Sequence, residues 1–301
     1  MVSGQELAFW REESCQAAIA RGISPKEVDW LLQSLAGLSP LSLRLESYKT
    51  DLEITLRIPF LKLKQLWEKR LQERVPIQYL VGETPWRDLT LKVSPAVLIP
   101  RPETEIIVEL ALQYGREQFA TGHWVDLGTG SGAIALALAK ALPEAKIHAV
   151  DNSPEALAIA KENAHLLGLT NQIEFYQGSW FSPLQHLQGE ISVMVSNPPY
   201  IPTATLAELQ PEVRQHEPMT ALNGGEDGLV AIRNLIQTAP QFLHDGGLWL
   251  IEMEARQANA VKELLENNAD YHPMTIHKDL AGIERFARAY VRKLPSDHYD
   301  G

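Results

Sequence analysis

The chain has 301 residues, 45% of them hydrophobic and 22% charged, which is the composition of an ordinary globular protein and a length that predicts two domains. The longest apolar run, near Ala133, is too short to span a bilayer, and the amino terminus lacks the basic and apolar regions of a signal peptide. Cys15 is the single cysteine, which excludes an intrachain disulfide and a zinc site with cysteine ligands. We therefore expect no membrane partner and no metal, and a reducing cytoplasm as the compartment.

The negative charge is unevenly distributed. Residues 1–90 carry 12 basic and 12 acidic side chains, whereas the remainder carries 15 basic and 26 acidic ones, so the whole excess of −11 lies in the larger portion. An enzyme that grips a nucleic acid usually presents a basic footprint instead. The charge therefore disfavours a nucleic-acid substrate and suits a cationic protein partner better.

Residues 1–76 have the pattern of a small helical bundle. Ser24-Pro25-Lys26-Glu27 matches a capping box with proline at the first helical position, which predicts a helix start. Apolar residues follow at helical spacing, both here and after Pro59: Val28, Leu31, Leu32 and Leu35, then Leu63, Leu66, Trp67 and Leu71. This domain carries no chemical motif, so docking of a partner and a purely stabilising role both stay open.

Residues 77–98 form the predicted linker to a second domain. Within it Leu89, Leu91 and Val93 alternate with polar residues, which is the period of a short β-hairpin. The next segment, Arg101–Glu105, opens a helix with acidic residues in its first turn, where they complement the helix dipole. A plain helix start and a wall of an active site both fit this segment.

From His123 onward, predicted strands alternate with predicted helices. The strands are His123–Leu127, Lys146–Asp151, Gln172–Gln177, Ile191–Ser196, Leu248–Glu254, Met274–His277 and Arg285–Val291, and the helices between them include Pro154–Leu167 and Gln257–Asn267. Such alternation predicts an α/β fold of Rossmann-like type, with a mostly parallel sheet covered on both faces. We assign this domain to residues 99–295 and a tail to residues 296–301.

A glycine-rich loop, Asp126–Gly132, leaves the first of these strands and enters a helix. Glycines let the backbone approach a ligand closely, and the helix amino end adds free N–H groups. Asp151 ends the next strand, where an acid binds a ribose diol in nucleotide-type folds. Gly128, Gly130 and Ala133 also satisfy the relaxed dinucleotide fingerprint, so the loop alone leaves a nicotinamide dehydrogenase open.

Asn197-Pro198-Pro199-Tyr200 follows a buried strand, and its two prolines cannot continue the sheet. The chain must therefore leave the sheet rigidly at its carboxyl edge, where open α/β sheets bind ligands. The turn offers an amide side chain, free carbonyls and an aromatic ring, which suit a planar –NH2 group. A dehydrogenase needs no such clamp, so this turn, with Asp126 and Gly132, argues against a dehydrogenase and for an enzyme that binds a substrate –NH2 group.

With these elements in place, the chain resembles class I S-adenosylmethionine-dependent methyltransferases, and within them the peptide chain release factor glutamine methyltransferases (the PrmC/HemK family). The likeness covers about residues 76–290, and the helical amino domain fits by size and type. Its motifs are Pro76–Leu80, Val93–Glu105, Asp126–Gly132, Val195–Ile201, His216–Pro218 and Asn223–Gly228. Methyltransferases that act on adenine or guanine share the proline turn, whereas the Ile99–Glu105 segment narrows the resemblance to the release factor family.

The resemblance implies a cofactor, S-adenosylmethionine, and a substrate, the glutamine side chain in the Gly-Gly-Gln loop of class 1 release factors. It also implies the roles of individual residues. Asp151 would hold the ribose and Trp180 would line the adenine pocket. The loop that wraps the methionine part would consist of Gly128, Thr129, Gly130, Ser131 and Gly132.

On the substrate side, the resemblance implies that Asn197 and the Pro198 carbonyl bind the acceptor amide next to the cofactor. Tyr200 would pack on that amide, with Pro199 stiffening the turn. Arg101 and Glu105 would shape the substrate side of the site.

The sequence departs from the family pattern at two places. Ser179 stands where the family commonly has an acid that caps the adenine amine, and an uncharged hydroxyl should bind that amine more weakly. Glu252–Arg256 replaces a strand end that contains glycine in relatives.

Because no His, Lys or Cys in the motifs is placed as a strong base, we expect catalysis by positioning and electrostatics. Two rivals stay open at this point. One is a methyltransferase that acts on an exocyclic amine of DNA or ribosomal RNA after base flipping. The other is a non-catalytic module that keeps the fold and binds the cofactor without turnover.

Overall fold

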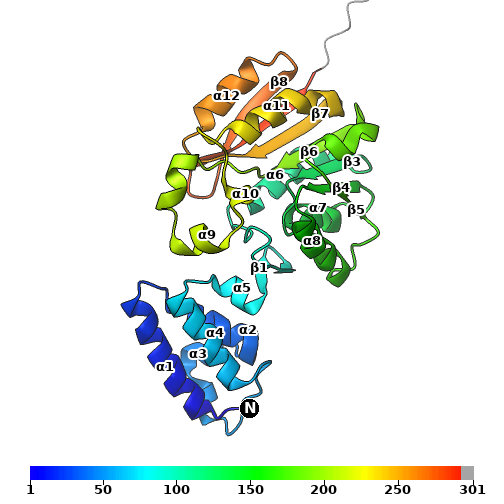
Figure 1. The fold of residues 1–301 in the computed structure, drawn as a ribbon. Coiled ribbons are helices and arrows are strands. Elements are labelled where there is room, and N and C mark those ends of the chain that lie inside the picture. Colours follow the sequence, from blue (N-terminus) through cyan, green and yellow to red (C-terminus); the bar gives the residue numbers. More distant parts are fainter. Residues whose placement is uncertain (293–301) are drawn as a thin grey trace, which may run out of the picture. The chain divides into compact units, whose positions relative to one another are not determined.

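The structure, a computed structural model, describes residues 1–292 (Figure 1). Contacts divide the chain into two compact units. The helical unit comprises Met1–Glu83 together with Gln210–His216, and the sheet unit comprises Thr84–Leu209 and the chain from Glu217 onward. The predicted tail at 296–301 lies outside the described residues.

The helical unit is the predicted bundle. It contains α1 (Gly4–Ala20), α2 (Lys26–Ala36), α3 (Pro40–Leu45), η1 (Ser47–Thr50), α4 (Phe60–Gln72), α5 (Ile77–Val81) and α9 (Pro211–His216). Val28, Leu31, Leu32 and Leu63 are completely buried, as their helical spacing predicts, and Trp67 joins the same core. The amphipathic pattern therefore accounts for the packing of this unit.

The predicted capping box at Ser24–Glu27 is wrong. Helix α2 begins at Lys26, Pro25 is its N-cap residue, and no side chain caps it. The physical reason is a competing partner. The Glu27 carboxylate accepts hydrogen bonds from Arg70 Nε at 2.6 Å and Nη2 at 2.9 Å, so it does not turn back to the helix start.

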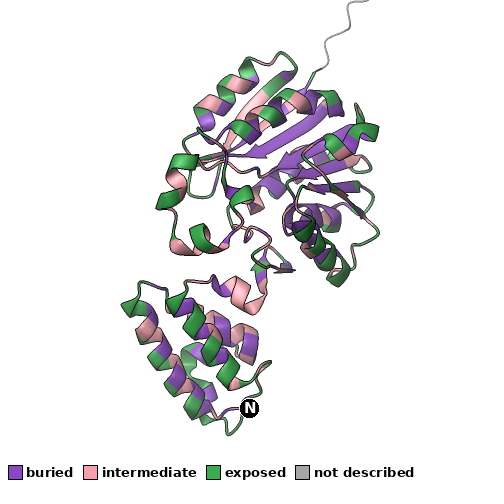
Figure 2. Ribbon diagram, viewed as in Figure 1, coloured by how far each residue is buried: buried purple, intermediate pink, exposed green. Residues whose placement is uncertain are grey.

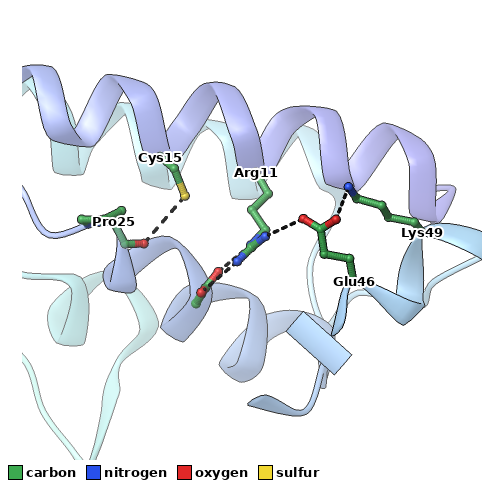
Figure 3. A network of polar contacts seen from close by, with 6 residues as sticks. Arg11, Cys15, Pro25, Glu46 and Lys49 are labelled. Atoms are coloured by element: carbon green, nitrogen blue, oxygen red, sulfur yellow. Dashed lines mark hydrogen bonds and ion pairs between the residues drawn. The ribbon is translucent and has the colours of Figure 1, made fainter. Parts of the chain in front are cut away.

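Ion pairs link α1 to its neighbours within the helical unit (Figure 3). The Arg11 guanidinium donates to both Asp29 oxygens, at 2.6 and 3.0 Å, and lies 3.6 Å from Glu46. The cysteine, Cys15, contacts the Pro25 carbonyl at 3.9 Å. Burial raises the pKa of its thiol, which makes it a packing residue and a poor nucleophile.

The short helix α9 reaches the helical unit from the second half of the chain. Arg70, 4% exposed, lies 2.9 Å from the Glu212 carboxylate, and Arg74 lies 2.6 Å from the same oxygen. His216 contacts the Glu73 carbonyl at 2.8 Å through Nε2. The polypeptide thus leaves the sheet unit after Leu209, contributes one helix to the bundle and returns.

The sheet unit contains a seven-stranded sheet in the order β5-β4-β3-β6-β7-β9-β8. Its strands are β3 (His123–Leu127), β4 (Lys146–Asp151), β5 (Ile173–Gln177), β6 (Ile191–Ser196), β7 (Leu243–Glu252), β8 (Tyr271–Lys278) and β9 (Glu284–Val291). β9 pairs antiparallel with β7 and β8, and the remaining neighbouring strands pair in parallel. The predicted Rossmann-like, mostly parallel sheet is therefore confirmed, although β7 begins five residues before the predicted position and ends two residues earlier.

Helices cover both faces of this sheet, and its strands are largely buried (Figure 2). One face packs on α6 (Glu105–Phe119), α7 (Ala133–Ala141) and α8 (Pro154–Leu166), and the other on η2 (Ser182–Leu187), α11 (Val230–Phe242) and α12 (Ala258–Glu266). The predicted hairpin forms as β1 (Glu83–Trp86) and β2 (Leu89–Lys92), and Asn163 of α8 accepts from Lys92 N at 2.6 Å. Between β6 and α11 lie η3 (Thr203–Glu208), α9 and α10 (Met219–Leu222).

Within residues 1–292, no helix combines the length and apolar character that a membrane span requires.

Candidate functional site

The strand order places a topological switch point between β3 and β6. The chain runs outward from β3 to β4 and β5, then crosses back to β6 on the other side of β3. Ligands bind outside the carboxyl ends of the strands at such a point. The Ser196 hydroxyl donates to the Leu127 carbonyl at 2.7 Å and holds the two strand ends together. The glycine loop and the proline turn therefore emerge side by side.

The glycine loop needs glycine for its backbone conformation. Gly128, Gly130 and Gly132 have φ angles of 80°, 56° and 85°, a region that residues with a Cβ rarely adopt. A Cβ at Gly128 would also lie 3.4 Å from the ring of Trp180. The loop thus keeps its backbone open toward the edge of the sheet.

Asp126 stabilises this loop from inside the protein. Its completely buried carboxylate accepts from Thr129 Oγ1 at 2.6 Å and from Ala135 N, at the start of α7, at 3.1 Å. Burial raises its pKa to about 7, and the two hydrogen bonds act against that shift. Asp126 therefore shapes the loop from inside the protein and does not face the cavity.

Asp151, at the end of β4, connects the glycine loop to α8. Its Oδ2 accepts from Gly130 N at 2.8 Å, and its Oδ1 accepts from Ser153 N at 2.9 Å. Ser153 in turn caps α8 by accepting from Ala156 N at 3.0 Å. The carboxylate is thus fixed at the position where the sequence predicted a ribose-binding acid.

A cavity opens at this edge of the sheet unit. Its lining includes Val97, Leu98, Gly128, Gly130, Val150, Asp151, Asn152, Ser179, Trp180, Asn197, Pro199, Pro218 and Thr220. The mixture of apolar walls with a few polar groups is typical of small-molecule sites. A carboxylate for vicinal hydroxyls and an indole for a flat heterocycle fit an adenosine-type cofactor. No cluster of three or more His, Cys, Asp or Glu side chains in the described part of the chain could hold a metal ion.

The cavity brings together some of the sequence-predicted residues and not others. Of the predicted site residues, Thr129, Ser131 and Gly132 of the glycine loop and Pro198 and Tyr200 of the proline turn do not line it. Thr129 and Ser131 are buried, and the Ser131 carbonyl accepts from Asn163. Trp180 lies against the cavity with a φ of 48°.

The proline turn is held firmly from several sides. Asn197 lines the cavity and donates through Nδ2 to Thr104 Oγ1 at 3.1 Å. The Tyr200 hydroxyl donates to Glu252 Oε1 at 3.3 Å, and the Tyr200 carbonyl accepts from Gln257 Nε2 at 2.9 Å. A Cβ at Gly228 would lie 2.3 Å from that carbonyl, so the backbone approaches the turn closely there.

The Arg101–Glu105 segment is fixed by ion pairs and hydrogen bonds. Arg101 Nη2 donates to Glu217 Oε1 at 2.6 Å, and Ile99 N donates to Glu217 Oε2 at 3.3 Å. Glu105 accepts from Arg87 N at 3.0 Å, in the turn of the hairpin. Neither Arg101 nor Glu105 lines the cavity, and their proposed substrate contacts stay predictions.

Sequence reasoning missed three polar residues of this region: Thr104, Glu217 and Glu252. Each is buried and bonded to a residue far away in the sequence. One signal in the sequence could have pointed to two of them, because Thr104 and Glu217 lie inside the segments on which the resemblance rests. Glu252 was noted only as part of an altered strand end.

Comparisons with known proteins agree with this geometry. A family profile described as a methyltransferase domain matches residues 120–290. The release factor glutamine methyltransferase of Synechocystis sp. is 50% identical over 292 residues, covering 96% of this chain and 97% of that protein. The protein of the same name from Thermosynechococcus vestitus is 44% identical over 290 residues, covering 96% of this chain and 99% of that protein. The chain belongs to the release factor glutamine methyltransferase family.

Solved structures place the methyltransferase in the same fold class. The catalytic domain of hMettl16, in complex with the MAT2A 3′UTR hairpin 6, aligns with a TM-score of 0.56 at 14% identity, covering 81% of this chain and 86% of that chain. This likeness shows the fold alone. The glycine loop alone fitted both a methyltransferase and a nicotinamide dehydrogenase. Membership of a methyltransferase family excludes the dehydrogenase.

Proposed function

We propose that the protein transfers a methyl group from S-adenosylmethionine to the side-chain amide nitrogen of the glutamine in the Gly-Gly-Gln motif of class 1 peptide chain release factors. Relatives that bear this function in their names match nearly the full chain. The observation that carries the proposal is the Asn197 amide. It lines the cavity beside the glycine loop, and its nitrogen is engaged by Thr104, so its oxygen is available to an acceptor amide.

The residues of the cavity fit this cofactor. Asp151 would bind the ribose hydroxyls, Trp180 the adenine, and the Gly128 and Gly130 backbone the amino-acid part. When bound, S-adenosylmethionine supplies an electrophilic methyl group on a sulfonium. Thr129 and Ser131 would act through the shape of the loop, because their side chains point into the protein.

Asn197 and Pro198 would provide most of the catalysis. An amide nitrogen is a weak nucleophile because its lone pair is delocalised into the carbonyl. The Asn197 side-chain oxygen and the Pro198 carbonyl would accept both amide hydrogens and favour the positive charge that develops on the nitrogen. Tyr200 and Pro199 would hold the turn rigid, which lowers the entropic cost of reaching the reactive arrangement.

The helical unit and the compartment belong to the same proposal. A single glutamine side chain gives too little contact for selectivity, so we propose that the helical unit docks the release factor. Arg101 and Glu105 would shape the substrate side of the site. The enzyme would work in the cytoplasm, where its single free cysteine stays reduced.

Mass spectrometry of a class 1 release factor incubated with the enzyme and S-adenosylmethionine tests the function. One added methyl group on the glutamine of the Gly-Gly-Gln motif is the expected result. Parallel incubations with DNA and ribosomal RNA test the rival class of amino methyltransferases. Methyl incorporation into nucleic acid and none into the release factor would reject the proposal, and cofactor binding without turnover on any substrate would indicate a non-catalytic module.

Replacement of Asn197 by alanine tests the amide clamp. By analogy with single oxyanion donors, Asn197→Ala should cost roughly 2.7–4 kcal/mol of transition-state stabilisation, or about 100- to 1,000-fold in kcat. The measurement is the initial rate of release factor methylation. Asn171→Ala, at an exposed turn position in the sheet unit, is the matched control and should retain full activity. A loss below about threefold in Asn197→Ala would contradict the clamp, because direct charge stabilisation is worth far more.

A further inference from the structure

We propose that the β8–β9 loop, residues Asp279–Ile283, is a contact surface for the release factor, with Leu280 as its apolar anchor. The expected partner is an apolar side chain in the segment of the release factor that flanks the Gly-Gly-Gln motif. The inference rests on the proposed function for the identity of this partner. It adds a surface that lies outside the cavity lining and that no sequence motif indicated.

The first observation is an apolar side chain that is almost completely exposed. Leu280 is 98% exposed, and Ile283 in the same loop is 37% exposed. A single exposed apolar side chain needs no explanation by itself, because such residues are common on protein surfaces. What indicates a partner here is the rigidity of the loop that carries the leucine, together with the place of that loop beside the site.

The second observation is a set of hydrogen bonds that fixes the β8–β9 loop. Asp279, 8% exposed, accepts through Oδ1 from Ala281 N and from Ile283 N, both at 2.9 Å. Its own N–H donates to the Ile283 carbonyl at 2.7 Å, and its carbonyl accepts from Gly282 N at 3.0 Å. Arg285 Nε donates to the other carboxylate oxygen at 2.7 Å. Because the backbone is already ordered, little conformational entropy is lost when a partner binds to it.

The third observation is that the loop emerges at the same edge of the sheet as the site. β9 pairs antiparallel with both β7 and β8, so β8 runs in the direction of β7 and ends at the carboxyl edge. Met253 N, just after β7, donates to the Arg285 carbonyl at 2.8 Å. Glu252, the last residue of β7, accepts from the Tyr200 hydroxyl at 3.3 Å. The proline turn, the end of β7 and the β8–β9 loop thus follow one another along this edge.

The proposed position of the cofactor indicates the direction from which the acceptor approaches. Gly128 and Asp151, which would bind the cofactor, lie at the carboxyl ends of β3 and β4, on one side of β6. In-line transfer requires the methyl donor and the attacking nitrogen on opposite sides of the methyl group. The acceptor chain would therefore approach over β7 and β9, on the other side of β6, and the β8–β9 loop lies on that path.

The geometry of the sheet gives the position of the contact on the partner. Neighbouring strands lie roughly 4.8 Å apart, so the loop between β9 and β8 is about 10–15 Å from the proline turn that follows β6. An extended chain covers about 3.3 Å per residue. Leu280 should therefore contact a residue roughly three to five positions away from the acceptor glutamine.

Steady-state methylation of a class 1 release factor by the full chain tests the inference. Leu280→Ser should raise the KM for the release factor roughly 5- to 30-fold, because part of the burial of one leucine side chain is lost. The kcat and the Kd for S-adenosylmethionine should stay within about twofold of the wild-type values, because the loop does not line the cavity. Leu280→Met should keep the wild-type KM. Leu166→Ser, 57% exposed at the end of α8, is the matched control and should keep it as well.

A cross-linking experiment without turnover separates this inference from the proposed function. The full chain, with p-benzoylphenylalanine in place of Leu280, is irradiated together with the release factor and S-adenosylhomocysteine. The cross-link should fall in the peptide that contains the Gly-Gly-Gln motif. If the wild type methylates no release factor but this cross-link forms, the proposed function fails and the contact stands. If the wild type is active, a KM for Leu280→Ser within about twofold of the wild-type value would overturn the inference. The absence of a cross-link in that peptide would overturn it in either case.

Discussion

At the scale of single residues, Asp151 combines two tasks in one carboxylate. Its oxygens hold Gly130 N and Ser153 N, so it shapes the cavity wall in addition to facing the cavity. We expect Asp151→Ala to weaken S-adenosylmethionine binding by roughly 1.5–3 kcal/mol, the value of a hydrogen bond to a charged group, or about 10- to 150-fold in Kd. Isothermal titration calorimetry measures this directly.

The control for this experiment is Glu155→Gln, a nearby acid in the first turn of α8 that does not line the cavity. Its cofactor affinity should stay at the wild-type value. An unchanged Kd for Asp151→Ala would remove this residue from the ribose site.

A second residue-scale prediction concerns His148, which is 2% exposed. Its ring nitrogens contact His123 Nδ1 at 2.9 Å and the Tyr176 hydroxyl at 3.2 Å. Burial, and then the neighbouring His123, lower its pKa from 6.5 to about 4. Between these values the unfolded chain binds a proton that the folded chain does not. The stability that His148 contributes is therefore complete above pH 6.5 and is lost as the pH falls toward 4.

The raised pKa values of Asp126 and Glu252 act in the opposite direction, so the His148 contribution must be isolated by difference. The free energy of unfolding of the wild type minus that of His148→Gln should grow by about 3 kcal/mol between pH 4 and pH 7. Urea denaturation across this range measures it. A flat difference would contradict the low pKa.

At the scale of elements, the turn from β3 into α7 depends on Gly132. Its φ of 85° strains any other residue, and a Cβ there would lie 3.1 Å from Leu136 Cδ1 and 3.2 Å from Ala160 Cβ. The glycine thus lets α7 and α8 pack closely beneath the cavity. Gly168 has a similar φ of 71° but open space where a Cβ would lie. The two positions share a positive φ, and Gly132 is crowded where Gly168 is not.

We therefore expect Gly132→Ala to lower the free energy of unfolding by roughly 1–3 kcal/mol more than Gly168→Ala, because it adds overpacking to the same backbone strain. Chemical denaturation of both variants provides the comparison. Equal losses would mean that the neighbouring helices shift to make room for the added Cβ. The positive φ would then be the only reason for glycine at position 132.

At the scale of the whole molecule, local patterns in the sequence were enough to predict the architecture. Apolar periodicity located each strand of the sheet and two helices of the bundle, α2 and α4, because burial on a face repeats with the backbone. It also indicated which loops meet at the carboxyl edge, as shown by the cavity that Gly128 and Asn197 share.

Pairings between distant residues could not be predicted in this way. Glu27 was assigned to a helix cap because its partner, Arg70, lies 43 residues further along the chain. Thr104 and Glu217 were missed for the same reason, since their partners are fixed only when the chain has folded. Local rules describe what a side chain can do, and the fold selects among those possibilities.

The return of the polypeptide to the bundle through α9 has a practical consequence. A fragment that stops at Glu83 would lack one of the seven helical segments of its own unit and would leave Arg70 without its bond to Glu212. A fragment that starts at Thr84 would carry α9, without the rest of the helical unit, in the loop that follows the proline turn. The two halves of this enzyme cannot be separated by a single cut without damaging both.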